Sequence, residues 1–414
     1  MMGPVLDLDP ETARQRLLRA RFRARPERLW PDLRPDQLQD ALKVIAEMAG
    51  AALLNERKQV LAEADQALSV AGYVSGMGPL LGYWIECGLI DAPADVEDIF
   101  SLHLRHNRRR MLRLTAEAVA MARLFDGAGI TPTIIKGMHT AHAYFPEPGT
   151  RPVSDIDLVM GSTGAMNAAQ RLLSERGYLP GPLIIPENRQ DWRRPDVPET
   201  PRSLDFVHQD DPWTIDLQAS FDRHFPAGKI VRLDELASSA AMAAWPLSDC
   251  ANVLPQPLLT LHLAVHASQG FNSLTLMRLT ELALVIRADR ANGILIWEEF
   301  VELADRIGAL GFVYPAFLFT EELAAGTIPA DILARCAAAA PRAVRRFLSG
   351  HTCWSVQRIH RWSRQEAFVW CDDIFGRIRA VAGYLTPRTD TSLRGVASLY
   401  RRQIGIALRL MNSN

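Results

Sequence analysis

The sequence predicts an α+β fold, in which a small mixed sheet with helices is flanked by N-terminal and C-terminal helical regions. Short β-branched runs near 131–138 and 155–160 alternate with helical segments in the middle of the 414-residue chain. Apolar residues at helical spacing dominate the chain before this part and after residue 257. We therefore expect an N-terminal helical region at 1–97, a core at 98–250 and a C-terminal helical domain at 251–414.

The composition is that of an ordinary globular protein, with 48% hydrophobic residues and a formal net charge of −1. This charge argues against bulk nucleic-acid binding, so no nucleic-acid partner is expected. The chain contains no run of roughly 18 apolar residues that could cross a bilayer, and its start lacks the order of a signal peptide. We expect a cytoplasmic protein without a transmembrane segment. The five cysteines are scattered and suggest neither disulfides nor a zinc site.

The expected elements begin with helices. Apolar spacing predicts them from about 35 to 68, interrupted near Gly50, and from about 96 to 126. Strand, helix, strand and helix follow from 131 to 176. From residue 257 onward nearly everything is expected to be helical. The segment 391–411 has arginines opposite an apolar face, so it either closes the helical domain or binds a partner or a membrane surface.

Six prolines between 180 and 201 predict a long loop rather than a central strand. This loop carries Arg189, Arg193 and Arg194. We expect either a segment whose arginines bind an anionic acceptor or a triphosphate, or a surface excursion. Beyond it, two strand-like runs at 203–208 and 213–221 are separated by the turn residues at 209–212. This pattern predicts a hairpin.

Asp155 and Asp157 stand in the run Asp-Ile-Asp-Leu-Val-Met. Side chains alternate between the faces of a strand, so the two carboxylates project from one side, roughly 7 Å apart. Oxygen ligands of this kind suit Mg²⁺, with Mn²⁺ as an alternative. Nucleotidyl transfer with two metal ions needs such an arrangement. The simpler alternative is a pair of aspartates that ends a strand.

A third carboxylate would complete the site. Asp216 is the favoured candidate, because a single acid between apolar strand residues is costly to bury unless it faces a polar site. Asp205 is its rival. Lys136, one of only four lysines, lies between a β-branched run and Gly137, a context that suits an ammonium group near phosphate oxygens. The alternative for Lys136 is a strand end in solvent.

His262 and His266 are spaced to share one helical face, but no catalytic glutamate follows His262, so a zinc protease is improbable. His266 faces the cleft from the helical domain or is a structural histidine. We include His266 among the candidate nucleotide-binding residues, together with Ser154, which precedes Asp155.

At this point the sequence resembles the uncharacterised, or type 5, nucleotidyltransferase family of the nucleotidyltransferase-fold superfamily. The resemblance is carried by Ile-Ile-Lys-Gly at 134–137, a Tyr-x-Pro stretch at 144–146, Arg-Pro-x-Ser-Asp-Ile-Asp-Leu at 151–158 and Ile-Asp-Leu at 215–217. It covers roughly residues 98–290. Two positions depart from the family pattern: Glu281 replaces a usual aspartate, and Gln218 stands where histidine is frequent. The second departure leaves the general base open.

The resemblance implies a nucleotidyltransferase-type sheet and a magnesium-dependent enzyme with two ions. It places the metals on Asp155, Asp157 and Asp216, and nucleotide-phosphate contacts near Lys136, Gly137 and Arg151. It implies transfer of a nucleotidyl group, AMP from ATP, to a peptide, protein or small molecule. Members of this type occur beside lasso-peptide maturation genes. The alternatives are an aminoglycoside-type adenylyltransferase and a nucleotide-binding or regulatory protein without turnover.

Overall fold

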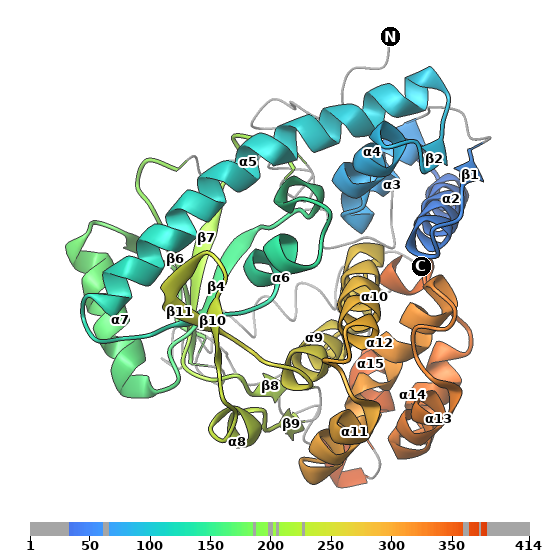
Figure 1. Ribbon diagram of the computed structural model, residues 1–414. Helices are drawn as coiled ribbons and strands as arrows, with labels where there is room; N and C mark the ends of the chain where they lie inside the picture. Colours follow the sequence, from blue (N-terminus) through green and yellow to red (C-terminus); the bar gives the residue numbers. More distant parts are fainter. Residues whose placement is uncertain are drawn as a thin grey trace, which may run out of the picture.

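The computed structural model describes residues 33–60, 66–184, 188–197, 202–203, 207–225, 228–358, 364–371 and 374–378. A seven-stranded mixed sheet lies among helices, with the N-terminal and C-terminal helices gathered on the other side of the molecule (Figure 1). The predicted α+β fold is confirmed. The segment 391–411 lies outside the described residues. None of the helices within the described ranges is long and apolar enough to span a membrane.

The sheet has the order β10-β11-β3-β4-β7-β6-β5. Two strand pairs, β11 with β3 and β4 with β7, are parallel, and the other neighbours are antiparallel. The strands, in chain order, are β3 (Thr133–Ile134), β4 (Asp155–Val159), β5 (Leu179–Pro180), β6 (Arg189–Arg193), β7 (Thr214–Gln218), β10 (Ala243–Trp245) and β11 (Ser248–Val253). Strands β4 and β7 therefore lie at the centre of the sheet.

One face of this sheet is apolar and packs on α5 (Ala94–Asp126) and α7 (Thr163–Glu175). Ile156 and Leu158 of β4, with Ile215 and Leu217 of β7, are almost completely buried in this core. Each such side chain contributes about 1.5–3 kcal/mol by leaving water. Because neighbouring residues in a strand point to opposite faces, this packing turns the aspartates between them to the other face.

The predicted succession of strand, helix, strand and helix is confirmed by β3, α6 (Gly137–Ala143), β4 and α7. A short 3₁₀ helix, η2 (Pro148–Thr150), precedes β4. Helix α7 begins where the side chain of Ser162 accepts a hydrogen bond of 3.1 Å from the backbone N–H of Ala165. The helix crosses the apolar face and returns the chain toward β5.

The N-terminal and C-terminal helices share one hydrophobic core. Leu42 and Ile45 of α2 belong to the same core as Ile286 of α10 and Phe317 of α12. The N-terminal elements are α2 (Pro35–Leu53), β1 (Lys58–Gln59), α3 (Gln66–Ser75), α4 (Gly78–Glu86) and β2 (Ile90–Asp91), where β1 and β2 form a small parallel pair. From there α5, 33 residues long, runs across to the sheet (Figure 1). The division into three regions stays a prediction.

The C-terminal half begins with an antiparallel pair, β8 and β9, and continues as helices. Its described elements outside the large sheet are β8 (Arg223–His224), β9 (Ile230–Val231), α8 (Asp234–Ala237), α9 (Leu258–Ser268), η6 (Phe271–Ser273), α10 (Leu276–Ala291), α11 (Trp297–Arg306), α12 (Leu310–Leu323), α13 (Ala330–Ala339), α14 (Arg342–Leu348), η7 (Val356–Arg358) and α15 (Arg364–Val369). The expectation of helices after residue 257 is met throughout this described part.

The prediction of a long structureless loop at 181–201 is wrong, because it contains strand β6. The six prolines flank this strand rather than interrupt it: none lies between Pro186 and Pro195. The backbone N–H groups of β6 are thus available to pair with β7 on one side and β5 on the other.

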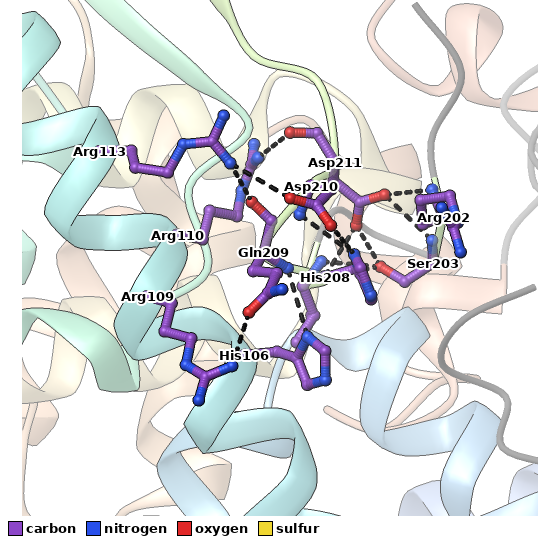
Figure 2. Close-up of polar contacts among 11 residues, drawn as sticks. His106, Arg109, Arg110, Arg113, Arg202, Ser203, His208, Gln209, Asp210 and Asp211 are labelled. Atoms are coloured by element: carbon purple, nitrogen blue, oxygen red, sulfur yellow. Dashed lines mark hydrogen bonds and ion pairs between the residues drawn. The ribbon is translucent and has the colours of Figure 1, made fainter. Parts of the chain in front are cut away.

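The predicted hairpin of 203–208 with 213–221 is also wrong, since the antiparallel partner of β7 is β6. The carboxylate of the buried Asp211 accepts hydrogen bonds from the backbone N–H groups of Arg202, Ser203 and His208. It also accepts one from the hydroxyl of Ser203 (Figure 2). Asp211 therefore closes a compact turn, as aspartates do when they bond nearby backbone groups.

Candidate metal and nucleotide site

Three carboxylates meet on the polar face of the sheet, those of Asp155 and Asp157 on β4 and of Asp216 on β7. Asp157 lies directly opposite Asp216 in the parallel pairing of the two strands. One oxygen from each carboxylate lies within 4.8 Å of those of the other two. The structure thus brings together the three predicted ligands, while Asp205 lies outside the described residues. The arrangement fits a hard divalent cation, which takes carboxylate oxygens.

The carboxylates of this cluster affect one another's protonation. Burial raises the pKa of Asp216 well above its ordinary value, and the charge of Asp157 raises it further. Burial also acts to raise the pKa of Asp157, but the positive charges of Lys136 and Arg189 outweigh it and the pKa is lowered. The pKa of Asp155 is raised by burial and then by Asp157. A divalent cation would relieve this repulsion between neighbouring carboxylates.

Lys136 lies at the centre of the site. Its Nζ donates to Oδ1 of Asp157, and its side chain is only 9% exposed, so the alternative of a solvent-facing strand end is excluded. Its backbone has φ of 56°, in the region that favours glycine. Such a conformation costs on the order of 1–3 kcal/mol and is found mainly where the surroundings impose it. The fold therefore accepts an unfavourable backbone conformation at Lys136, and its ammonium group lies at Asp157.

Gln218, two residues beyond Asp216, connects two of the carboxylates. Its Nε2 donates to Oδ1 of Asp157 at 3.0 Å and to Oδ2 of Asp216 at 2.7 Å. Its Oε1 accepts from Nη1 of Arg223 at 2.9 Å. Because a guanidinium group only donates, this contact fixes which end of the amide faces the carboxylates.

Arg223 connects the site to helix α9 of the C-terminal helical region. Nη2 of Arg223 lies 2.7 Å from Nε2 of the buried His262 on α9. Since arginine donates, Nε2 must accept, and His262 is held neutral; burial and then the charge of Arg223 lower its pKa well below the ordinary value. The sequence spacing of His262 and His266 had suggested a metal pair at most, and the structural partner of His262 is an arginine instead.

Arg189 of β6 was expected in a loop and lies in the site. Its Nε donates to Oδ1 of Asp216 at 2.7 Å, and its Nη2 lies 3.7 Å from Oδ1 of Asp191. The only signal that could have placed it is the proline-free window at 187–194, in which charged residues alternate with Gln190 and Trp192.

Arg151 and Gly137 form a support beside the carboxylates. Arg151 donates to both carboxylate oxygens of Glu281 on α10, at 2.9 and 2.8 Å, and to the carbonyl of Pro152 at 3.0 Å. A Cβ at position 137 would lie 2.3 Å from Nη1 of Arg151, so a larger residue there would require the guanidinium group to move away from its place beside Glu281. The ion pair of Arg151 with Glu281 joins the segment before β4 to α10. Nucleotide contact by either residue stays a prediction.

Ser154 and His266 are the two remaining candidates for nucleotide contact. The exposed Ser154 donates from Oγ to Oδ1 of Asp155 at 3.0 Å. His266 lies one helical turn after His262, with stacked rings 6.4 Å apart. Burial and then the charge of Lys136 lower the pKa of His266 well below its ordinary value. The effect of Lys136 agrees with a histidine on the site-facing side of α9, and its nucleotide contact stays a prediction.

Arg110 of α5 connects the segments that lead into the two central strands, β4 and β7. Its guanidinium group, fully buried, donates to the carbonyl of Asp211 (Figure 2). It also donates to the carbonyls of Pro212 and Val153, at 2.8 and 3.2 Å. These carbonyls lie two or three residues before the first residues of β7 and β4, the strands that carry the aspartates. Burial lowers the pKa of Arg110 to about 10. The sequence offered no sign of this role.

A family model described as "Uncharacterised nucleotidyltransferase" matches residues 58–325. The chain belongs to this family. The match extends from β1 to just beyond α12, farther on both sides than the expected 98–290, and it includes every site residue described above. No curated protein and no solved structure matches the chain. Membership in the family supports a transferase with a nucleotide substrate, and the acidic cluster is consistent with a divalent metal.

Proposed function

We propose that the protein is a metal-dependent nucleotidyltransferase that transfers AMP from ATP to a hydroxyl, carboxylate or phosphate group of an acceptor. One observation carries the proposal: the side chains of Asp155, Asp157 and Asp216 converge on one face of the central strands, with the ammonium group of Lys136 among them. Family membership supports the same reaction class. The resemblance further suggests a peptide as acceptor, in lasso-peptide tailoring.

The carboxylate set would hold Mg²⁺, which when bound neutralises charge on the phosphates of the nucleotide. Lys136 would contact the same phosphates, because its flexible stem lets the ammonium group move from Asp157 to a nearby anion. Asp155 and Ser154 are the more exposed members of the site. The triphosphate would therefore enter on their side, with His266 across the site on α9.

A nucleotide-binding protein without turnover is the second candidate. The observation in its favour is that two of the carboxylates already have cationic partners, Lys136 for Asp157 and Arg189 for Asp216. In a working enzyme the pairing with Lys136 must open or be shared when the metal and the nucleotide bind. The two candidates differ in whether pyrophosphate is released.

The test has two measurements. Calorimetry with an ATP analogue that carries a methylene group between its α and β phosphates should show binding that depends on Mg²⁺ and is lost in Asp157→Asn. Incubation with ATP labelled at the α phosphate and a panel of peptide, sugar and aminoglycoside acceptors should release pyrophosphate and label one acceptor class. Absence of magnesium-dependent binding would overturn the proposal. Binding without pyrophosphate release from any acceptor would favour the second candidate.

A further inference from the structure

We propose that Arg189 takes the place of one of the two metal ions used in two-metal nucleotidyl transfer. The site then works with a single divalent ion held by Asp155 and Asp157. This inference rests on the proposed function and narrows it, since it assigns Asp216 to a guanidinium group rather than to a metal.

Asp216 already has a donor at each of its oxygens. Nε of Arg189 lies 2.7 Å from Oδ1, and Nε2 of Gln218 lies 2.7 Å from Oδ2. The side chain of Asp216 has no exposure to solvent. A charge-assisted hydrogen bond from arginine to a buried carboxylate is strong, and breaking it would leave both groups without their partners. A metal ion at Asp216 would have to displace this pair.

Asp155 and Asp157 are different, because the contacts of each fall on one oxygen. Oδ1 of Asp157 accepts from Lys136 and Gln218, and Oδ1 of Asp155 accepts from Ser154. Asp157 also lies against the carboxylate of Asp216. No lysine, arginine, amide or hydroxyl hydrogen bond of the described site residues falls on Oδ2 of Asp155 or Asp157, so we expect a metal ion to bind there. The two aspartates lie two residues apart on one strand face and can share one ion.

The register of the sheet explains why Arg189 reaches this place. Arg189 lies opposite Gln218, and Asp191 lies opposite Asp216, which lies opposite Asp157. Three carboxylates therefore form a row across β4, β7 and β6. Arg189 lies two residues from this row along β6, on the same face of the sheet. Partial burial acts to lower the pKa of Arg189. The negative charges of this row and of Asp155 outweigh it, so the pKa is raised and the guanidinium group stays charged.

Arg189 brings a positive charge to the buried carboxylate of Asp216, as a metal ion would. Arginine keeps its charge at all relevant pH values and binds phosphate through a planar fork of donors. In phosphoryl transfer an arginine can stabilise the charge that develops in the transition state. Arg189 is placed to do this at the metal site.

Electron paramagnetic resonance with Mn²⁺ tests the inference on the full-length protein. Two ions in a two-metal site lie roughly 3.5–4 Å apart and give a spin-coupled spectrum, whereas one ion gives an uncoupled spectrum. With the α,β-methylene ATP analogue present, we expect one uncoupled Mn²⁺ per wild-type chain. Arg189→Ala should bind two Mn²⁺ with a coupled spectrum, because Asp216 then lacks its cation. Arg194→Ala is the matched control, since Arg194 pairs with Glu117 and Asp196 instead.

A second variant covers the case in which Arg189→Ala does not fold. Asp216→Asn should keep one Mn²⁺ with affinity within about threefold of wild type, whereas Asp157→Asn should lose it. Two coupled ions in the wild type, or loss of Mn²⁺ in Asp216→Asn, would overturn the inference and leave the proposed function standing. No bound Mn²⁺ in the wild type would overturn both.

Discussion

Arg223 donates to the side-chain oxygen of Gln218 at 2.9 Å, and this contact turns the amide nitrogen of Gln218 toward Asp157 and Asp216. The family pattern often has histidine at this position, and here an amide with a fixed orientation stands in its place. Because Arg223 is itself held by His262 on α9, a helix outside the sheet sets the geometry of the carboxylates.

Replacement of Gln218 by Met should lower kcat by roughly 10- to 100-fold with little change in KM, because a loss of positioning affects the reacting geometry more than nucleotide binding. Steady-state kinetics of pyrophosphate release would measure it. Gln190→Met is the control: Gln190 lies on the other face of neighbouring strand β6 and bonds Gln170. Equal effects of the two substitutions would show that Gln218 acts only through stability.

Asp155→Asn and Asp157→Asn should each reduce nucleotidyl transfer by at least about 100-fold, since each removes a charged metal ligand. The fold should persist, because asparagine has the same shape and both residues lie on the polar face of the sheet. Pyrophosphate release and circular dichroism would be measured together. Turnover within tenfold of wild type in either variant would show that the replaced aspartate is not an essential metal ligand. Asp216→Asn should weaken transfer comparably, through its contact with Arg189.

Lys136→Ala should mainly raise KM for the nucleotide, because an ammonium group on the phosphates contributes to ground-state binding. Lys136→Gly separates the charge from the backbone, since glycine adopts φ of 56° without strain. Both variants should show the same KM, while Lys136→Gly should have the higher melting temperature. Wild-type kinetics in both would exclude a phosphate contact.

The free energy of unfolding should fall in acid because α5 carries the buried histidine His103. Burial lowers the pKa of His103 to about 3, so the native state holds it neutral, whereas the unfolded chain binds a proton below about 6.5. As pH falls from about 6.5, the unfolded state gains this proton and the free energy of unfolding drops by up to about 1.4 kcal/mol per pH unit.

The measurement is urea unfolding between pH 7 and pH 5. His103→Gln should be less stable near pH 7, where it loses the packing of the ring on Tyr73 and Phe100. Its free energy of unfolding should depend less steeply on pH, by up to one proton, so the difference from wild type should narrow as the pH falls. His139, whose pKa is lowered to about 4 chiefly by burial, leaves part of the dependence in the variant. Identical slopes for wild type and variant would show that His103 is protonated in the native state.

Local sequence patterns predicted the part of the site that lies on single strands. The alternation in 155–159 placed two aspartates on one face, and the isolated acid between Ile215 and Leu217 indicated the third. Such patterns also indicated Lys136, but they did not place Arg189 and Arg223 at the carboxylates. Arg189 reaches Asp216 through the pairing of β6 with β7, which the prolines around β6 concealed. Arg223 and His262 meet only because β8 packs near α9, a contact that no spacing in the sequence encodes.

The core that α2 shares with α10 and α12 has a consequence for biosynthesis. On the ribosome, α2 emerges just before its neighbour α3, but more than 200 residues before α10 and α12. At about 5–20 residues per second, the part of its apolar face that these two later helices cover waits on the order of ten seconds or longer. The sheet, whose own core draws on α5 and α7, has all its residues available before α10 and α12 emerge. The nascent chain thus needs protection, by a chaperone or by transient contacts, at its first helices rather than at its catalytic strands.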